Sequence, residues 1–209
     1  TRLRTVTGVQ TCALPISQAM DALLRDHEVK IDGFICPGHV SVITGTGIYR
    51  FIAEQYRIPC VVSGFEAWDF LCSVRRLLQQ VVDGRAEVEN EYSRAVTEAG
   101  NLAAQQLMAE VFEPCDAVWR GIGTIAGSGL SIRKEFAAFD AARALDVVFT
   151  PAKVNPACLC GSVLRGAATP LDCRLFGRAC SPMHPIGPCM VSSEGVCAAY
   201  YKYEKRAAA

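Results

Sequence analysis

The sequence lacks any long hydrophobic run, and this absence limits the classes of protein to which the chain can belong. Its longest apolar stretches, such as 58–62 and 144–149, are far shorter than the roughly 20 residues that a helix needs to cross a bilayer. The first residues contain no sustained apolar segment and no small-residue cleavage site, so a secretory signal is not expected. We therefore expect a soluble, cytoplasmic protein without membrane association.

The chain also has no net charge. Its 21 Lys and Arg residues balance 21 Asp and Glu residues, and charged residues make up only 20% of the sequence. A nucleic-acid partner is not expected, because no basic surface would attract the phosphates. The segment G-T-G-I-Y-R at 45–50 lacks both G-x-G-x-x-G and the P-loop lysine, so nucleotide binding is only weakly supported.

Cysteine is abundant: the chain has 11, and six of them fall within residues 158–197. Four are spaced C-x12-C-x6-C-x16-C, with glycine and proline throughout the intervening loops: Cys160, Cys173, Cys180 and Cys197. Such a segment cannot bury enough apolar side chain to fold by packing alone, so its loops need a metal centre or disulfides to hold them together. Disulfides are disfavoured in the reducing compartment that we expect.

The spacing favours an iron–sulfur cluster over zinc. Four thiolates on a backbone that turns tightly are typical of such clusters, whereas zinc sites usually contain C-x2-C pairs, which this chain lacks. Zinc, disulfides and unliganded cysteines remain alternatives. Spacing alone does not exclude Cys158 or Cys189 as a ligand, and a surplus thiol could instead take part in redox exchange.

Before the cysteine-rich segment, the apolar pattern alternates between helices and strands. We predict helices over 17–29, 67–82 and 92–111, and strands over 31–36 and 58–63. Successive strand–loop–helix units favour a parallel sheet covered by helices, with a ligand crevice at the carboxyl ends of the strands. Frequent glycines within 117–132 argue against a regular helix there and favour bulged strands or a substrate-facing loop.

The predicted fold class is therefore α/β, a partial parallel sheet flanked by helices and followed by a small cysteine-rich iron–sulfur domain. We place the α/β domain at 17–150 and the cysteine-rich domain at 151–209, because helical periodicity stops where the cysteine density rises. Residues 1–16 resemble translated adapter sequence, and we expect them to be non-native.

Three polar side chains are candidate functional residues. His39 follows Pro-Gly at the end of the first predicted strand, and Glu66 takes the equivalent place after the second, so both would lie at the expected crevice. A lone histidine is more often structural, and Glu66 is at least as well placed to cap the following helix. Glu194, three residues before Cys197, could perform acid–base chemistry or bond backbone amides.

A series of motifs extends from about Gln18 to Tyr203. They include P-G-H-V-S, V-V-S-G-F-E, W-R-G-I-G, C-G-S-V-L-R-G, P-L-D-C-R-L-F-G-R-A-C and C-M-V-S-S-E-G-V-C-A-A-Y-Y. Together they resemble the motifs of the [NiFe]-hydrogenase formation protein family HypD. The resemblance implies a [4Fe-4S] cluster in the domain at 151–209, held by the four cysteines of the C-x12-C-x6-C-x16-C set.

The resemblance also implies an assembly factor rather than a turnover enzyme. Its role would be to help build the Fe(CN)2CO unit of the hydrogenase active site, with a HypC-type small chaperone and a HypE-type cyanide donor as partners. The cluster would supply electrons to a thiol pair. His39 and Glu194 would face the cleft in which the iron unit is assembled.

Two motifs of the family, C-G-x-H for iron binding and G-P-G-C-P-V-C for a redox pair, are not found in this sequence. The resemblance therefore implies the C-terminal portion of such a protein, able to hold the cluster but not the iron unit. Two other functions remain as alternatives. One is a stand-alone iron–sulfur oxidoreductase whose small substrate binds between P-G-H-V-S and S-G-F-E, and the other is a structural zinc module.

Overall fold

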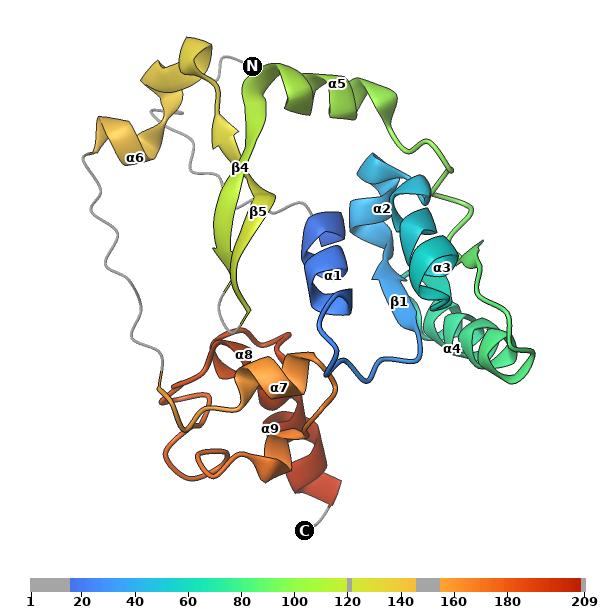
Figure 1. Cartoon of the computed structure of the whole chain (residues 1–209), viewed down its shortest axis with the longest axis vertical. Helices are drawn as coiled ribbons and strands as arrows, with labels where there is room; N and C mark the ends of the chain where they lie inside the picture. The colour runs from blue at the N-terminus through green and yellow to red at the C-terminus, as the bar shows by residue number, and fades with distance from the viewer. Residues whose placement is uncertain (1–15, 120–121, 146–154, 208–209) are drawn as a thin grey trace.

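The structure, a computed structural model, describes residues 16–119, 122–145 and 155–207. Its first part alternates helices and short strands (Figure 1). In chain order these are α1 (Ile16–Leu24), β1 (Phe34–Pro37), α2 (Gly38–Thr44), the 3-10 turn η1 (Gly47–Tyr49), α3 (Arg50–Tyr56), β2 (Cys60–Ser63), α4 (Ala67–Val82) and β3 (Val88–Asn90).

The three strands form a parallel sheet in the order β1-β2-β3. All four residues of the central strand β2 are buried, as expected for the near-continuous apolar run of a strand covered on both faces. Phe34 pairs with Cys60, which in turn pairs with Val88, so the carboxyl ends of the strands lie at one edge. The predicted α/β class with a partial parallel sheet is confirmed.

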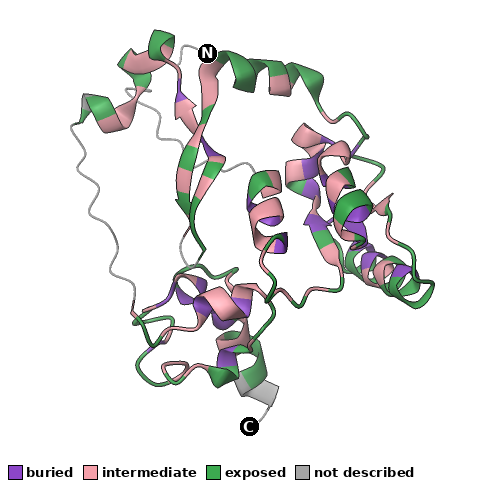
Figure 2. Cartoon of the chain, viewed as in Figure 1, coloured by how far each residue is buried: buried purple, intermediate pink, exposed green. Residues whose placement is uncertain are grey.

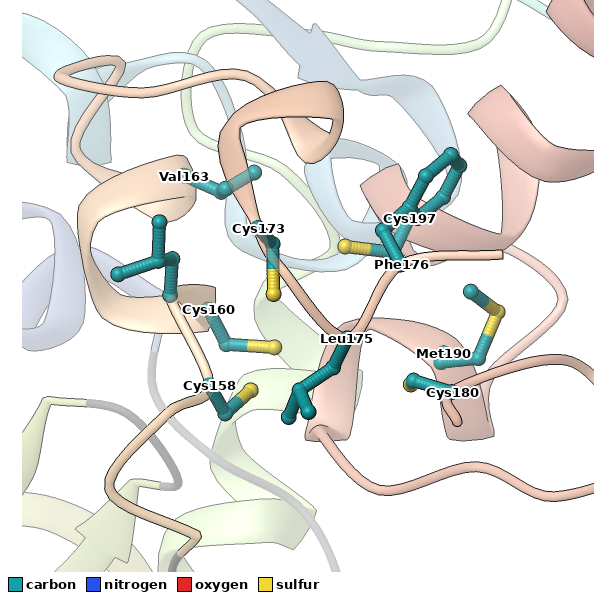
Figure 3. A pocket seen from close by; sticks show the side chains of 10 residues that line it. Cys158, Cys160, Val163, Cys173, Leu175, Phe176, Cys180, Met190 and Cys197 are labelled. Carbon is teal, nitrogen blue, oxygen red and sulfur yellow. The ribbon is translucent and has the colours of Figure 1, made fainter. Parts of the chain in front are cut away.

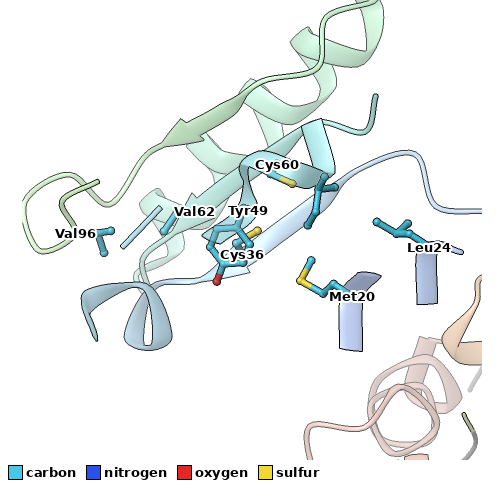
Figure 4. Close-up of a cluster of buried hydrophobic side chains, with 8 residues drawn as sticks. Met20, Leu24, Cys36, Tyr49, Cys60, Val62 and Val96 are labelled. Atoms are coloured by element: carbon cyan, nitrogen blue, oxygen red, sulfur yellow. The ribbon is translucent and has the colours of Figure 1, made fainter. Parts of the chain in front are cut away.

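The core of this part lies between the sheet and helices α1 and α3 (Figure 4). Met20 and Leu24 of α1 approach Cys36, Tyr49 and Cys60, and these three side chains have almost no exposed surface. The Tyr49 hydroxyl lies 3.2 Å from the Ser41 hydroxyl, and burial raises the pKa of Tyr49 to about 12. The thiols of Cys36 and Cys60 hydrogen-bond with each other, which together with burial raises the pKa of Cys36.

The predicted helix over 92–111 is wrong in its first half, because α5 begins only at Leu102. The preceding residues form turns that are fixed by tertiary contacts. Val96 is buried, and its carbonyl accepts a hydrogen bond of 2.8 Å from the Asn90 side chain. The helix starts where the Asn101 side chain caps its first turn.

The glycine-rich segment belongs to an antiparallel hairpin. Its elements, with the helices on either side, are α5 (Leu102–Val111), β4 (Phe112–Trp119), β5 (Gly123–Ile132), the 3-10 helix η2 (Lys134–Phe139) and α6 (Ala141–Ala144). The register shifts between Cys115 and Ala117, which confirms the prediction of bulged strands. The Trp119 indole N–H donates to the Ser128 hydroxyl at 2.8 Å across the hairpin.

The cysteine-rich segment folds into short helices joined by turns. These are α7 (Cys160–Leu164), the 3-10 turn η3 (Pro170–Asp172), α8 (Pro188–Val191) and α9 (Val196–Ala207). Arg165 joins this segment to the loop between α1 and β1, since its guanidinium lies 2.7 Å from the Asp26 carboxylate. Its carbonyl also accepts a hydrogen bond of 2.9 Å from the Lys30 backbone N–H.

The boundary that we predicted at 150/151 lies outside the described residues, as do residues 1–15 of the segment expected to be non-native. Within the described ranges, none of the helices is both long enough and apolar enough to cross a membrane.

Candidate metal centre

Five cysteines from separate turns and helices line one small cavity in the cysteine-rich segment (Figure 3). We call it the cysteine cavity. Its walls consist of cysteine and apolar side chains: Cys158, Leu159, Cys160, Val163, Cys173, Leu175, Phe176, Cys180, Met190 and Cys197. The lining therefore offers sulfur as its only strong donor type toward a metal.

Helix and turn ends place the first three of these thiols. Cys160 is the first residue of α7, and Cys158 lies just before that helix. Cys173 directly follows the last residue of the 3-10 turn η3. The start of η3 is fixed by a hydrogen bond of 2.8 Å that the Asp172 carboxylate accepts from the Thr169 backbone N–H. Each thiol thus stands at the end of a short element, where the backbone can turn toward a common centre.

The other two thiols come from later in the chain. Cys180 lies in a tight turn in which its carbonyl accepts the Gly177 N–H at 3.0 Å. Its sulfur accepts a hydrogen bond of 3.3 Å from the Ile186 backbone N–H. Cys197 lies in the first turn of α9 and is buried against the other cysteines. Backbone N–H donors to sulfur are a recurring feature of thiolate-bound clusters.

Burial makes the charged form of these thiols costly in the absence of a cation. It raises the pKa of Cys158 to about 11 and that of Cys197 to about 12. It also raises the pKa of Cys189, whose thiol hydrogen-bonds with Cys160. Several thiolates could not be held together here without a positively charged centre to compensate them.

The residues that line the cavity fit a thiolate-bound cluster in two respects. Their donor atoms are sulfurs, and Gly187 leaves room for two of these sulfurs. A Cβ added at Gly187 would lie 2.5 Å from the Cys160 sulfur and closer still to the Cys158 sulfur, so the two thiols use the space that a side chain would fill. Among the described residues, however, no group of three or more His, Cys, Asp or Glu has the geometry of a preformed site for one metal ion. In a cluster each cysteine binds a different iron, so its sulfurs need not converge on a single ion.

The four cysteines predicted as ligands are brought together by the fold, because Cys160, Cys173, Cys180 and Cys197 all line the cavity. Cys158 lines it as well, whereas Cys189 is buried beside it without being part of the lining. Their assignment as ligands stays a prediction. Cys158 is therefore better placed than Cys189 to replace one of the four predicted ligands.

His39 lies elsewhere, at the carboxyl ends of the parallel strands. Its exposed ring has its centroid 5.4 Å from that of Phe65, and Phe65 meets Tyr92 edge-on at 6.4 Å. The Arg94 guanidinium lies over the Tyr92 ring, 4.5 Å from its centroid. We call these four residues the rim. The sequence placed His39 and the S-G-F-E turn, which contains Phe65, at this edge, but Tyr92 and Arg94 were missed because they follow a strand that was not predicted.

Asp69 holds the rim in place from the first turn of α4. Its carboxylate accepts two hydrogen bonds from Arg94, of 2.8 and 2.6 Å, and one of 3.2 Å from the Glu66 backbone N–H. The hydrogen bonding from Arg94 is the main cause that lowers the pKa of Asp69. Glu66 occupies the N-cap position of α4, which agrees with the capping interpretation of this residue.

The rim and the cysteine cavity lie toward opposite ends of β1. The cysteine-rich segment contacts Lys30, before the strand begins, while His39 is the second residue after the strand ends. Glu194 is exposed between α8 and α9, where its backbone N–H donates to the Ser192 hydroxyl at 3.2 Å. Neither His39 nor Glu194 belongs to the lining of the cysteine cavity.

Comparisons with known proteins identify the family. A family model described as "HypD: Hydrogenase formation hypA family" matches residues 6–204, and so begins within the segment that we expected to be non-native. The chain is 45% identical over 203 residues to the hydrogenase maturation factor HypD of Cupriavidus necator, covering 94% of this chain and 54% of that protein. It is 50% identical over 176 residues to HypD of Rhizobium leguminosarum bv. viciae, covering 84% and 46%.

HypD of Azotobacter vinelandii is similar in the same way, with 46% identity over 194 residues that cover 90% of this chain and 51% of that protein. These three relatives are named hydrogenase maturation factors. The chain belongs to the HypD family. It spans about half the length of the curated relatives it matches.

Proposed function

We propose that this chain takes part in assembling the Fe(CN)2CO unit during hydrogenase maturation, with a [4Fe-4S] cluster held in the cysteine cavity. The ligands would be Cys160, Cys173, Cys180 and Cys197. The observation that carries the cluster proposal is the convergence of five thiols on a cavity whose other walls are apolar. The assembly role is supported by membership of the HypD family, whose named relatives are hydrogenase maturation factors.

A bound cluster would supply electrons one at a time. The residues around it have the properties that such a cofactor requires. Leu175, Phe176 and Met190 would keep water away from the sulfurs, and the Phe176 ring is itself held edge-on against Tyr201 at 6.2 Å. The Ile186 N–H would stabilise negative charge on the Cys180 sulfur, because a hydrogen bond to a thiolate favours its charged form.

Anaerobic reconstitution with iron and sulfide tests the cluster. We expect about four iron and four acid-labile sulfide per chain, together with visible absorption. Cys173→Ser should lose both, and Cys115→Ser, which alters a cysteine of the hairpin outside the cavity, should retain both. Iron and sulfide contents that stay near zero, or stoichiometric zinc in their place, would reject the proposal.

Separate serine variants decide which cysteines are ligands. We expect Cys160→Ser to abolish the cluster, and Cys158→Ser and Cys189→Ser to leave its iron and sulfide content unchanged. The opposite result for Cys158 and Cys160 would transfer the ligand role to Cys158, which lines the same cavity. Loss of the cluster in Cys189→Ser would contradict the chosen set, since that thiol lies outside the lining.

The partners proposed from the family are a HypC-type small chaperone and a HypE-type cyanide donor. Because this chain spans about half of its relatives, we expect it to bind the chaperone more weakly than a full-length relative does. Affinity measurements with the purified HypC-type chaperone, using this chain and Cupriavidus necator HypD side by side, test this expectation. Binding to neither protein would reject the partner assignment.

A further inference from the structure

Helix α4 buries polar side chains and leaves most of its large apolar side chains exposed to solvent. The side chains that it buries are Asp69, Ser73 and Gln80. The first is held by Arg94, and the Gln80 side-chain oxygen accepts the Glu87 backbone N–H at 2.8 Å. An amphipathic helix on a globular protein normally has the reverse arrangement, with its apolar stripe against the core.

The opposite side of α4 carries a row of large apolar side chains, and we call this row the outer face of α4. Leu71 and Leu78 are 61% and 59% exposed, and Trp68 and Val82 are more exposed still. In Figure 2 much of α4 is coloured as exposed. A contiguous exposed patch of this kind is characteristic of an interaction surface.

The spacing of the outer face specifies the shape of its partner. Its members follow one another at intervals of three, four, three and four residues: Trp68, Leu71, Arg75, Leu78 and Val82. This is the a/d spacing of a helix that packs side by side with another helix. Arg75 is the only charged residue of the row, and a buried arginine at its centre requires a carboxylate opposite.

We propose that the outer face of α4 binds an α-helix from the part of the HypD family chain that lies outside these 209 residues. That helix would carry apolar side chains at a/d spacing and an acidic residue facing Arg75. The proposal rests on family membership and the surface itself, and it does not depend on the cluster.

Two further observations favour this occupant. The chain spans only 54% and 46% of two of its relatives, so the family contains a comparable length of polypeptide that must pack somewhere. In addition, β1 is a terminal strand of the sheet among the described residues, and its Ile35 is partly exposed. Parallel sheets are usually covered on both faces and extended beyond three strands, so more of the fold is expected beside α4 and β1.

A second copy of this chain fits the outer face less well. Arg75 lies at the centre of the row, with two apolar residues on either side. In a symmetric pair of α4 helices, parallel or antiparallel, the two Arg75 side chains would meet at the middle of an apolar seam. Like charges in such a position destabilise the pair.

The test is co-expression of the tagged 209-residue chain with the remainder of Cupriavidus necator HypD, outside the aligned residues. We expect the two to co-purify, and Leu71→Glu/Leu78→Glu to weaken the complex by about tenfold or more, as loss of central apolar anchors does. The matched control is Leu102→Glu/Leu107→Glu on α5, where both leucines are similarly exposed, at 65% and 62%. It should bind as the unaltered chain does.

Because the four leucines are exposed, neither double variant should change the thermal unfolding of the chain alone. Failure to co-purify, or equal binding by the unaltered chain and the outer-face variant, would overturn the proposal. So would a dimer of the chain alone, seen by light scattering and abolished by the outer-face variant, because this would make a second copy the occupant.

Arg75 provides a separate test of the partner's charge. Arg75→Lys should keep most of the affinity, and Arg75→Glu should weaken the complex by about tenfold or more, since it places like charges together. Equal affinities for these two variants would overturn the acidic residue that the proposal assigns to the partner helix.

Discussion

Replacing Gly187 with alanine inserts a methyl group between two thiols of the cysteine cavity. The backbone of Gly187 has φ −95° and ψ 153°, a conformation that alanine adopts without strain. Any effect of the substitution is therefore steric. The new Cβ would lie 2.5 Å from the Cys160 sulfur, whereas non-bonded heavy atoms prefer separations of about 3.5–4.0 Å.

The Cys158 and Cys160 sulfurs would each have to move by about 1 Å or more to restore a normal contact. Both are ends of short side chains that can rotate, so the cost lies toward the lower part of the range for overpacking, about 1–2 kcal/mol. In a chain of this size that corresponds to a Tm lower by about 2–8 °C. Rotation would also turn the sulfurs away from their present positions, so we expect the variant to incorporate less than half of the iron and sulfide.

The assay is thermal unfolding by circular dichroism under anaerobic, reducing conditions, followed by reconstitution and metal analysis. Gly47→Ala is the matched control, because a Cβ there would meet only the Glu98 carbonyl oxygen at an ordinary 3.6 Å. It should change neither the Tm nor the iron content appreciably. A Gly187→Ala protein with the stability and cluster content of the unaltered chain would refute the steric reasoning.

Three further predictions concern the scaffold. Ile52 is fully buried, so in urea unfolding Ile52→Val should lower the free energy of unfolding by about 0.5–1.5 kcal/mol and Ile52→Ala by about 2–5 kcal/mol. An alanine variant of unchanged stability would contradict the burial of this side chain. The Asp69–Arg94 pair should stabilise the fold above about pH 4, and this stabilisation should be lost as the pH falls through the lowered pKa of Asp69. In acid titrations, the unfolding free energies of Asp69→Asn and the unaltered chain should therefore converge at low pH. Ser128→Ala removes the acceptor of the Trp119 indole N–H and should lower the free energy of unfolding by about 1 kcal/mol. It should also shift the tryptophan fluorescence, and unchanged emission would argue against that hydrogen bond.

Sequence patterns located the strongly periodic elements well. The helix predicted over 67–82 has the bounds of α4, and the second strand was displaced by only two residues at its start. The third strand, Val88–Asn90, is three residues long, too short for a periodic pattern, and it was missed. Without it, Tyr92 could not be placed beside Phe65, nor Arg94 beside Asp69, because these contacts depend on which strand ends are neighbours.

The sequence also could not show which side of α4 faces the sheet. An apolar stripe on a helix normally indicates its buried side, but the side chains that α4 buries are Asp69, Ser73 and Gln80. Hydrogen bonds from Arg94 to Asp69 and from the Glu87 backbone N–H to Gln80 favour this orientation, and both donors lie beyond the end of the helix. The cysteine cavity was more predictable, since its ligand candidates lie close in sequence and are separated by glycine and proline turns.

The positions of the rim and the cavity constrain any shared chemistry. Lys30, which contacts the cysteine-rich segment, and Gly38, which precedes His39, are eight residues apart, a span of up to about 27 Å in extended chain. No rim residue belongs to the lining of the cysteine cavity, so a group bound beside His39 would be held by other side chains than a cluster in the cavity. Asp69, in the first turn of α4, holds Arg94 of the rim from the buried side of the helix. A helix bound to the outer face would lie on the side of α4 opposite Asp69, so its binding tests a surface separate from the rim.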